Sequence, residues 1–214
     1  MTTPQPATVG ILIFDDVEVL DFCGPFEVFS VARDVDANDG GDEPRPLYRA
    51  LTIAERPDIV RCSGGLLVQP HHTIADHPPL DLLVVPGGHG TRRELTNPAL
   101  LDWIVAQDRR TELTASVCTG SVLLAAAGLL DGKRATSHWA AIPWFREHYP
   151  AVEVLDGVRF VDQGRIVTSA GISAGIDMAL HVIERRHGRA VAEGTTRQME
   201  YEWERSRGGI ENLS

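Results

Sequence analysis

The sequence predicts a doubly wound α/β fold, with a mainly parallel sheet covered by helices on both faces. Segments of strand length alternate with segments of helical spacing along the chain. The strand segments are apolar throughout instead of alternating between apolar and polar residues, as expected for strands buried on both faces. In such sheets ligands bind beyond the carboxyl ends of the strands, so the loops that follow the strands are the places to search for a site.

The first half of the chain begins with a strand and a helix. Residues 8–14 form a continuous apolar run that we expect to be the first buried strand. Pro25 then indicates the first turn of a helix, because the N–H that proline lacks would be unpaired there in any case. The other elements expected in this half are extended segments at 48–54, 66–69 and 80–85 and a helix at 98–109.

The second half repeats the strand–helix pattern around a cysteine. Residues 113–117 are a short apolar strand that runs directly into Cys118, and the small apolar residues of 122–130 follow as a helix. The remaining expected elements are helices at 141–148 and 174–186, extended segments at 159–161 and 165–168, and a final helix that includes Tyr201 and Trp203.

Length indicates one domain. The 214 residues suit a single core, which we take to span 1–214 with a polar tail at 1–7. Residues 34–46 carry five acidic residues together with two glycines and two prolines, the composition of a solvated surface insertion.

Composition limits the partners. The net charge of −10 and the lack of a basic run argue against nucleic acid, and no apolar run is long enough for a membrane span. The first ten residues lack the features of a signal peptide, so we expect a cytoplasmic location. Cys23, Cys62 and Cys118 have no metal-ligand spacing, which favours free thiols and no metal.

Cys118 is the strongest candidate for chemistry. At a strand-to-helix turn its sulfur would point out at the sheet edge, close to the free N–H groups of the helix start. The positive end of the helix dipole would lower the pKa of the thiol and favour the nucleophilic thiolate. The alternative is that Cys118 is a small buried hydrophobic residue, as free cysteines usually are.

Three neighbouring loops offer further polar groups. Gly87 and Gly88 let backbone approach a ligand, and an N–H of this loop beside that of Thr119 would form a two-donor pocket for developing negative charge; the alternative is a plain turn. Asp21, ahead of the first helix, would serve as acid, base or water-holder, or else cap the helix. His138 has two open roles, a base near Cys118 or a structural histidine.

Four spaced motifs carry a family resemblance. They are LDFCGP at 20–25, PGGHG at 86–90, CTGS at 118–121 and GKRATSHW at 132–139. With them the chain resembles the ThiJ/PfpI superfamily, whose fold is flavodoxin-like and of the class I glutamine amidotransferase kind, over residues 9–185. Within it the chain is most similar to isonitrile hydratases and to amidase-like sensor domains of transcription regulators, with 168–177 as a further matching segment.

The resemblance implies a site and an activity. Cys118 would be the nucleophile, and Asp21 and Thr119 would be the catalytic residues beside it. The N–H groups of Gly88 and Thr119 would stabilise developing negative charge. His138 and Gly87 would surround these residues without taking part in the reaction. Isonitrile hydratases of this kind convert an isonitrile and water to an N-substituted formamide without a cofactor. A homodimer and a small-molecule substrate are expected.

Departures from other branches keep alternatives open. Thr119 stands where protease-like members have histidine, and Asp21 where glyoxalase-like members have glutamate; Cys23 replaces an expected threonine. A non-catalytic or redox sensor and a glyoxalase-type carbonyl scavenger therefore remain as the alternatives to a hydratase.

Overall fold

The computed structural model describes residues 5–34, 45–203 and 209–211. Most of the acidic insertion predicted at 34–46 lies outside these residues, as do the first four residues of the predicted tail. The insertion is bordered by two short strands, β2 (Arg33–Asp34) and β3 (Arg45–Pro46), which pair antiparallel.

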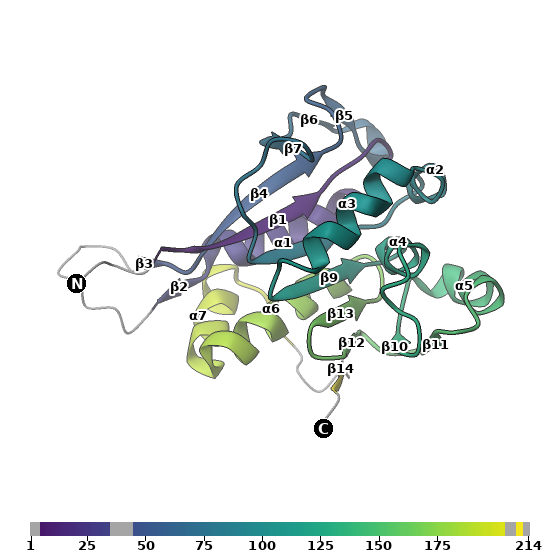
Figure 1. Ribbon diagram of the computed structural model, residues 1–214. Helices are drawn as coiled ribbons and strands as arrows, with labels where there is room; N and C mark the ends of the chain where they lie inside the picture. The colour runs from purple at the N-terminus through teal and green to yellow at the C-terminus, as the bar shows by residue number, and fades with distance from the viewer. Residues whose placement is uncertain (1–4, 35–44, 204–208, 212–214) are drawn as a thin grey trace.

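An eight-stranded sheet forms the centre of the molecule, and it is mainly parallel, as predicted (Figure 1). Among the described strands of this sheet, β12 and β13 pair antiparallel and the other neighbours pair parallel. In spatial order the strands are β14 (Gly209–Glu211), β12 (Phe160–Asp162), β13 (Ile166–Ser169), β9 (Leu113–Val117), β8 (Leu82–Val85), β1 (Ala7–Leu12), β4 (Tyr48–Ala54) and β7 (His72–Thr73).

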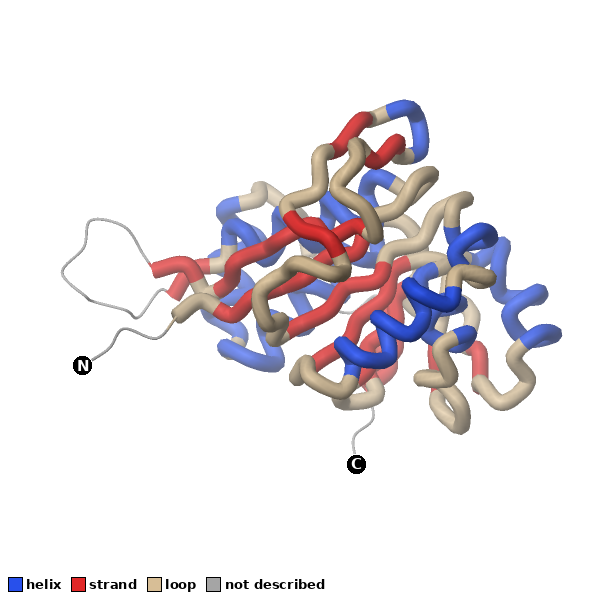
Figure 2. The backbone as a smooth tube through the Cα atoms, turned by 45° about the horizontal axis from the view of Figure 1, so that its top comes forward, coloured by secondary structure: helices blue, strands red, loops and turns tan. Residues whose placement is uncertain are grey.

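Helices cover both faces of the sheet (Figure 2). On one face α1 (Val19–Val31), α6 (Ala174–His187) and α7 (Arg189–Gln198) pack against one another, and α3 (Pro98–Asp108) and α4 (Gly120–Ala126) pack together on the other. Every residue of β8 and β9 is buried because helices lie on both sides, which explains why these strands are apolar without alternation. The doubly wound α/β class is confirmed.

The remaining described elements are short. They are the hairpin β5 (Val60–Arg61) and β6 (Leu67–Val68), the pair β10 (Arg134–Ala135) and β11 (Glu153–Val154), the helices α2 (Thr91–Glu94) and α5 (Ile142–His148), and 3-10 turns at Ser63–Gly65 and Trp139–Ala141.

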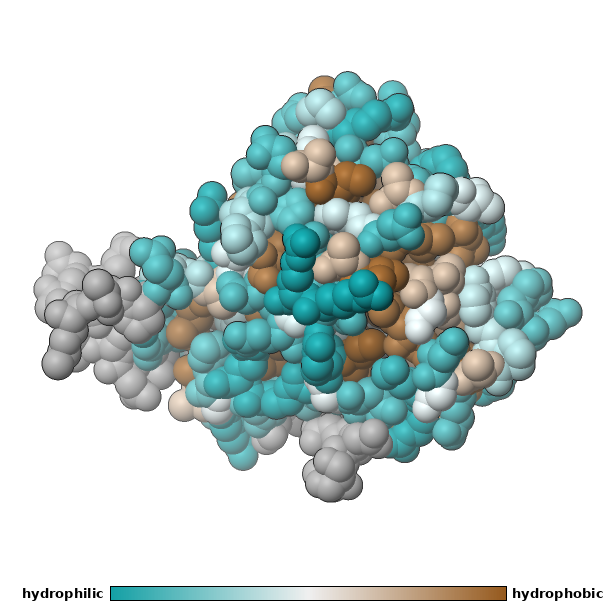
Figure 3. All heavy atoms as spheres, viewed as in Figure 1, coloured by the Kyte–Doolittle hydropathy of each residue, from teal (hydrophilic) through white to brown (hydrophobic). Residues whose placement is uncertain are grey.

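Hydrophilic residues cover most of the face seen in Figure 3, interrupted by hydrophobic patches. Among the described residues, no helix combines the length and the apolarity that crossing a membrane would require.

Three helix predictions are wrong in their boundaries. The helix expected at 122–130 is α4, which runs from Gly120 to Ala126. Helix α1 begins at Val19, so Pro25 lies inside it and not in its first turn, and Asp21 belongs to the first turn instead of to the preceding loop. Proline leaves the carbonyl four residues earlier without its helical partner, which here is that of Asp21. The last helix ends at Gln198, so Tyr201 and Trp203 follow it in a segment without regular secondary structure.

Candidate active site

The loops that follow β1, β8 and β9 meet at the carboxyl edge of the sheet, as predicted. The N–H of Gly87, just after β8, donates to Oδ2 of Asp21 in the first turn of α1, at 3.0 Å. A bridge between Val17 and Gly88 joins the same two loops. Cys118 follows β9, which pairs with β8, so the thiol enters the same region.

The backbone of Cys118 is held in an unusual conformation. Its φ of +57° lies in the left-handed region, which few non-glycine residues adopt. Its N–H donates to the carbonyls of Ser169 and Ala170, and its own carbonyl accepts from the hydroxyls of Ser121 and Ser137, at 3.0–3.3 Å. These bonds hold both the N–H and the carbonyl of Cys118, so they stabilise its strained backbone and thereby position the thiol.

Two glycines allow backbone to lie directly against the thiol. A Cβ added to Gly87 would be 2.5 Å from the N–H nitrogen of Thr119 and 2.9 Å from Cβ of Cys118. A Cβ added to Gly171 would be 2.9 Å from Sγ of Cys118 and 2.6 Å from Cδ2 of His138. Any side chain at either position would therefore displace the reactive group. Sequence reasoning did not single out Gly171, although it lies in the matched segment 168–177.

Asp21 is fully buried beneath the thiol. Its Oδ2 accepts from Gly87, while Oδ1 has no hydrogen-bond partner among the described residues. Burial raises the pKa of this carboxyl to about 7, against the opposing effects of the bonds from Gly87 and from the Cys118 thiol. The side chain makes no helix-capping bond, so the capping alternative is wrong.

The pKa of Cys118 is raised, opposite to the predicted direction. Burial of the thiol is the largest cause, followed by the negative charge of Asp21. The N–H and hydroxyl of Thr119 donate towards the sulfur and lower the pKa by less. Because each group disfavours the negative charge of the other, the thiol and the carboxyl titrate as a pair and readily share one proton.

Thr119 links the thiol to the loop after β8. Its Oγ1 accepts the N–H of Gly88 at 3.0 Å and contacts Oγ1 of Thr91 at 2.9 Å, and Thr91 donates to the Gly88 carbonyl at 2.7 Å. The Gly88 N–H, predicted as a donor to developing charge, is thus bonded to a side chain in this structure. Thr91 is a site residue that the sequence did not reveal, because the four-residue α2 is too short to show a period.

A pocket of about 240 Å³ opens above Cys118. His138 lines it, with Nδ1 accepting the N–H of Ala140 at 3.3 Å, so it also caps the turn at Trp139–Ala141. Cys23 is half-buried, packs against the core and does not line this pocket. The lining residues are Glu18, Gly88, His89, Arg92, Cys118, Thr119, His138, Ala140, Ala141 and Ile172.

No metal centre accompanies this pocket. Within the described part of the chain, no group of three or more histidine, cysteine, aspartate or glutamate residues is arranged to hold a metal ion.

Comparison with known proteins assigns the chain to a family. A sequence model of the DJ-1/PfpI family matches residues 7–185. The chain belongs to the DJ-1/PfpI family. Isonitrile hydratase of Pseudomonas putida is 37% identical over 196 residues, covering 90% of this chain and 78% of the relative. The HTH-type transcriptional regulator GbdR of Pseudomonas aeruginosa is 32% identical over 198 residues, 92% of this chain, which spans about half (52%) of the regulator.

Solved structures of this family share the fold. A ThiJ/PfpI family protein from Pseudomonas syringae superposes with a TM-score of 0.81 at 26% identity, over 94% of this chain and 78% of the other. DJ-1beta of Drosophila melanogaster gives a TM-score of 0.76 at 20% identity, over 93% of this chain and all of that one. The similarity to DJ-1beta concerns the fold alone.

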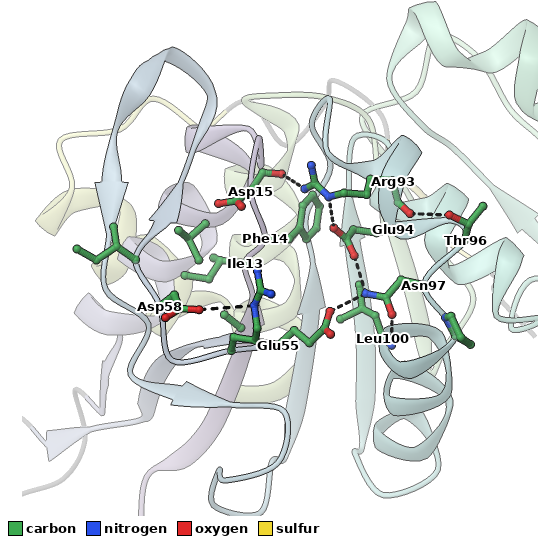
Figure 4. A pocket seen from close by; sticks show the side chains of 15 residues that line it. Ile13, Phe14, Asp15, Glu55, Asp58, Arg93, Glu94, Thr96, Asn97 and Leu100 are labelled. Carbon is green, nitrogen blue, oxygen red and sulfur yellow. Dashed lines mark hydrogen bonds and ion pairs between the residues drawn. The ribbon is translucent and has the colours of Figure 1, made fainter.

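This DJ-1/PfpI protein has a second, larger pocket of about 460 Å³ at the same sheet edge, between the loop after β4 and the start of α3 (Figure 4). Glu94 forms its wall, accepting from Nε of Arg93 at 3.0 Å and from Nδ2 of Asn97 at 2.9 Å. Asn97 also donates to Glu55 at 2.6 Å, and Arg93 to the carbonyl of Asp15 at 2.7 Å. The charged groups of this pocket are therefore bonded mainly to one another.

Proposed function

We propose that this protein hydrates isonitriles to N-substituted formamides, with Cys118 as the nucleophile. The observation that carries the proposal is the contact between the Cys118 thiol, which lines a small pocket, and the buried carboxyl of Asp21, whose pKa is raised. The similarity to isonitrile hydratase of Pseudomonas putida supports it. The chemistry requires only addition and proton transfer, so we propose that no cofactor takes part.

The first step adds the thiol across the terminal carbon of the isonitrile. In the active state the pair holds one proton, and Asp21 takes it from Cys118 as the sulfur attacks. The S–C bond forms, and Asp21 delivers the proton to the same carbon. The product is a thioimidate, R–N=CH–S–Cys118, with Asp21 again a carboxylate. A pKa of about 7 suits a group that must both accept and release a proton near neutrality.

The second step adds water to the thioimidate carbon. Asp21 removes a proton from the water as the C–O bond forms and passes this proton to the nitrogen, which gives the tetrahedral adduct R–NH–CH(OH)–S–Cys118. As the adduct collapses, Asp21 takes the hydroxyl proton and the C–S bond breaks. Asp21 then returns that proton to the departing sulfur, and R–NH–CHO is released. Oδ1 of Asp21 has no hydrogen-bond partner in the part of the chain that the structure describes, and it offers a second acceptor, so one carboxyl can hold the water while bonded to Gly87.

Thr119 supports the sulfur whenever it is negative. Its N–H and hydroxyl donate towards Sγ of Cys118, which stabilises the thiolate during attack and departure. Thr91 and Gly88 keep the Thr119 side chain in place. The apolar wall of Ala140, Ala141 and Ile172 would receive the substituent of the isonitrile.

The test follows formamide formation from alkyl isonitriles by mass spectrometry. We expect turnover by the parent protein, its loss in Cys118→Ala, a strong decrease in Asp21→Asn, and retention in the matched thiol control Cys23→Ala. No turnover across a panel of alkyl and aryl isonitriles, by a folded protein with an intact Cys118, would overturn the proposal.

A non-catalytic sensor is the second candidate, because the chain also matches transcriptional regulators such as GbdR over 92% of its length. In that case a ligand would raise the melting temperature while no product forms. We further propose a homodimer and a cytoplasmic location; light scattering of the purified protein and cell fractionation test these two points.

A further inference from the structure

Arg92 is a cation in the reactive pocket without an anionic partner. It projects from α2 and lines the pocket together with Cys118. Its Nη1 is 2.9 Å from Nδ1 of His89, which orients the guanidinium. Within the described residues no carboxylate lies within ion-pair distance of Arg92, whereas the adjacent Arg93 pairs with Glu94 at 3.0 Å and with Asp16 at 3.6 Å.

The lining also contains the carboxylate of Glu18, which acts on Asp21 and forms no ion pair with Arg92. Its negative charge bears on Asp21 beneath the thiol, where it adds to the effect of burial on that carboxyl. Ala140, Ala141 and Ile172 also line the pocket and carry no charge. The positive charge of Arg92 is therefore a feature of this pocket that the hydration chemistry leaves unused.

The guanidinium group is suited to a carboxylate. Its planar array of N–H donors matches the two oxygens of a carboxylate in a bidentate, charge-assisted pair. The net charge of −10 gives the protein no general attraction for anions, so selection of an anion has to come from a local cation. A volume of about 240 Å³ restricts the ligand to a small molecule.

We infer that the pocket selects small isocyano carboxylic acids, whose carboxylate pairs with Arg92 while the isonitrile carbon meets Cys118. The inference rests on the proposed hydratase function and names the substrate class of the same site. Because Glu18 carries the opposite charge in the same lining, it opposes the carboxylate and moderates the preference.

Matched substrates provide the test. Isocyanoacetate and 3-isocyanopropanoate are compared with their methyl esters, which carry the same isonitrile without the charge. We expect kcat/KM for an acid to exceed that for its ester by about tenfold, the equivalent of one charge-assisted pair. Whichever of the two acids has the higher kcat/KM indicates the distance from the sulfur of Cys118 to the guanidinium of Arg92. Added salt should reduce the preference, since the pair is exposed at one end.

Variants assign the preference to one residue. Arg92→Gln should abolish the acid-over-ester ratio, Arg92→Lys should retain part of it, and Glu18→Gln should increase it. Arg93→Gln is the matched control, because Arg93 belongs to the neighbouring pocket, and it should keep the parental ratio.

The two proposals fail separately. Turnover of the esters with no preference for either acid, or a preference that survives Arg92→Gln, overturns this inference and leaves the hydratase function standing. No turnover of any acid or ester overturns both.

Discussion

Two pockets share the carboxyl edge of this sheet, and we propose that the smaller one holds the chemistry. In the larger pocket Glu94 is bonded to Arg93 and Asn97, and its neighbours are similarly paired. At the smaller pocket, Asp21 lies against the lining residue Cys118 and one of its oxygens is unpartnered among the described residues, and Arg92 has no described carboxylate partner. Unmet polar groups, more than volume, therefore distinguish a reactive site from a structural cleft.

The difference has an energetic meaning. Paired charges in the larger pocket satisfy one another and contribute to stability, whereas a buried carboxyl beside a buried thiol destabilises the fold whenever it is charged. Proteins keep such arrangements where function requires them. Substitutions in the larger pocket should consequently affect stability and not activity, whereas substitutions at Cys118 and Asp21 should affect activity and, for Asp21, also the dependence of stability on pH.

The largest contrast is expected from replacing one group in each pocket. Cys118→Ala should lower kcat for formamide formation by about 10³-fold or more, because the covalent path is lost. Glu94→Gln, which keeps the shape and one acceptor oxygen, should leave kcat close to the parental value. Steady-state kinetics of both variants measure kcat for formamide formation. If Glu94→Gln lowered kcat as much as Cys118→Ala does, the distinction between the two pockets would be wrong.

Asp21→Asn should lower kcat/KM by about 10²- to 10⁴-fold, since a general acid–base group is removed. In the parent, kcat/KM should rise as the pH increases through about 7, because the pair must lose one of its two protons before Asp21 can accept that of Cys118. The variant should lack this rise. If kcat/KM of Asp21→Asn still rose through about pH 7, the rise could not be assigned to this carboxyl.

The same carboxyl should couple stability to pH. Its pKa of about 7 in the folded protein exceeds the ordinary value of 3.8, so folding favours its protonated form. The unfolding free energy should therefore decrease as the pH rises from about 4 to about 7 and then level off. Asp21→Asn should abolish this decrease, a difference of up to about 4 kcal/mol. Urea denaturation at several pH values measures it, with Cys23→Ala expected to follow the parent.

A smaller effect is expected from the bonds next to the loop at 170–173, which contributes Ile172 to the reactive pocket. Arg159 donates to Asp177 at 2.6 Å and to Ser173 at 3.2 Å, and Tyr201 donates to Asp177 at 2.8 Å. Arg159→Gln should lower the unfolding free energy by about 1–2 kcal/mol, because a partly exposed charged bond is lost. It should also raise KM, since Ile172 belongs to this loop. Unchanged stability and KM would show that the loop is held by other contacts.

The smallest effect should come from the larger pocket. Asn97 caps α3, its Oδ1 accepting from the N–H of Leu100 at 3.3 Å, and it bonds to Glu55 and Glu94. Asn97→Ala should therefore lower the unfolding free energy by about 1 kcal/mol and leave formamide formation intact. Thermal unfolding with a parallel activity assay checks both parts; a loss of activity would connect the pockets.

The sequence predicted much of this fold because its strands are buried on both faces and show it in continuous apolar runs. Residues 113–117 were expected as a strand and form β9 with these same bounds. The convergence of three loops on Cys118 followed from the parallel arrangement. The sequence misplaces the start of α1 because proline favours the first turn of a helix, whereas Pro25 lies in the interior of α1 at the cost of one helical hydrogen bond.

The site was predicted less completely, for physical reasons. The direction of the Cys118 pKa depends on burial and on the distance to Asp21, neither of which a helix N-terminus reveals in the sequence. Thr91 and Arg92 come from a helix too short to show periodicity, and their roles follow from contacts that only the folded chain makes.

The bond from Gly87 to Asp21 joins residues 66 positions apart, and that from Cys118 to Ser169 joins β9 to β13. The thiol and its carboxyl are thus brought together only when four central strands have associated. Contacts between distant segments form slowly, since the intervening chain must first be closed into loops. During refolding, helical circular dichroism should return before catalytic competence does, and Cys118 would serve as a reporter of the last stage of assembly.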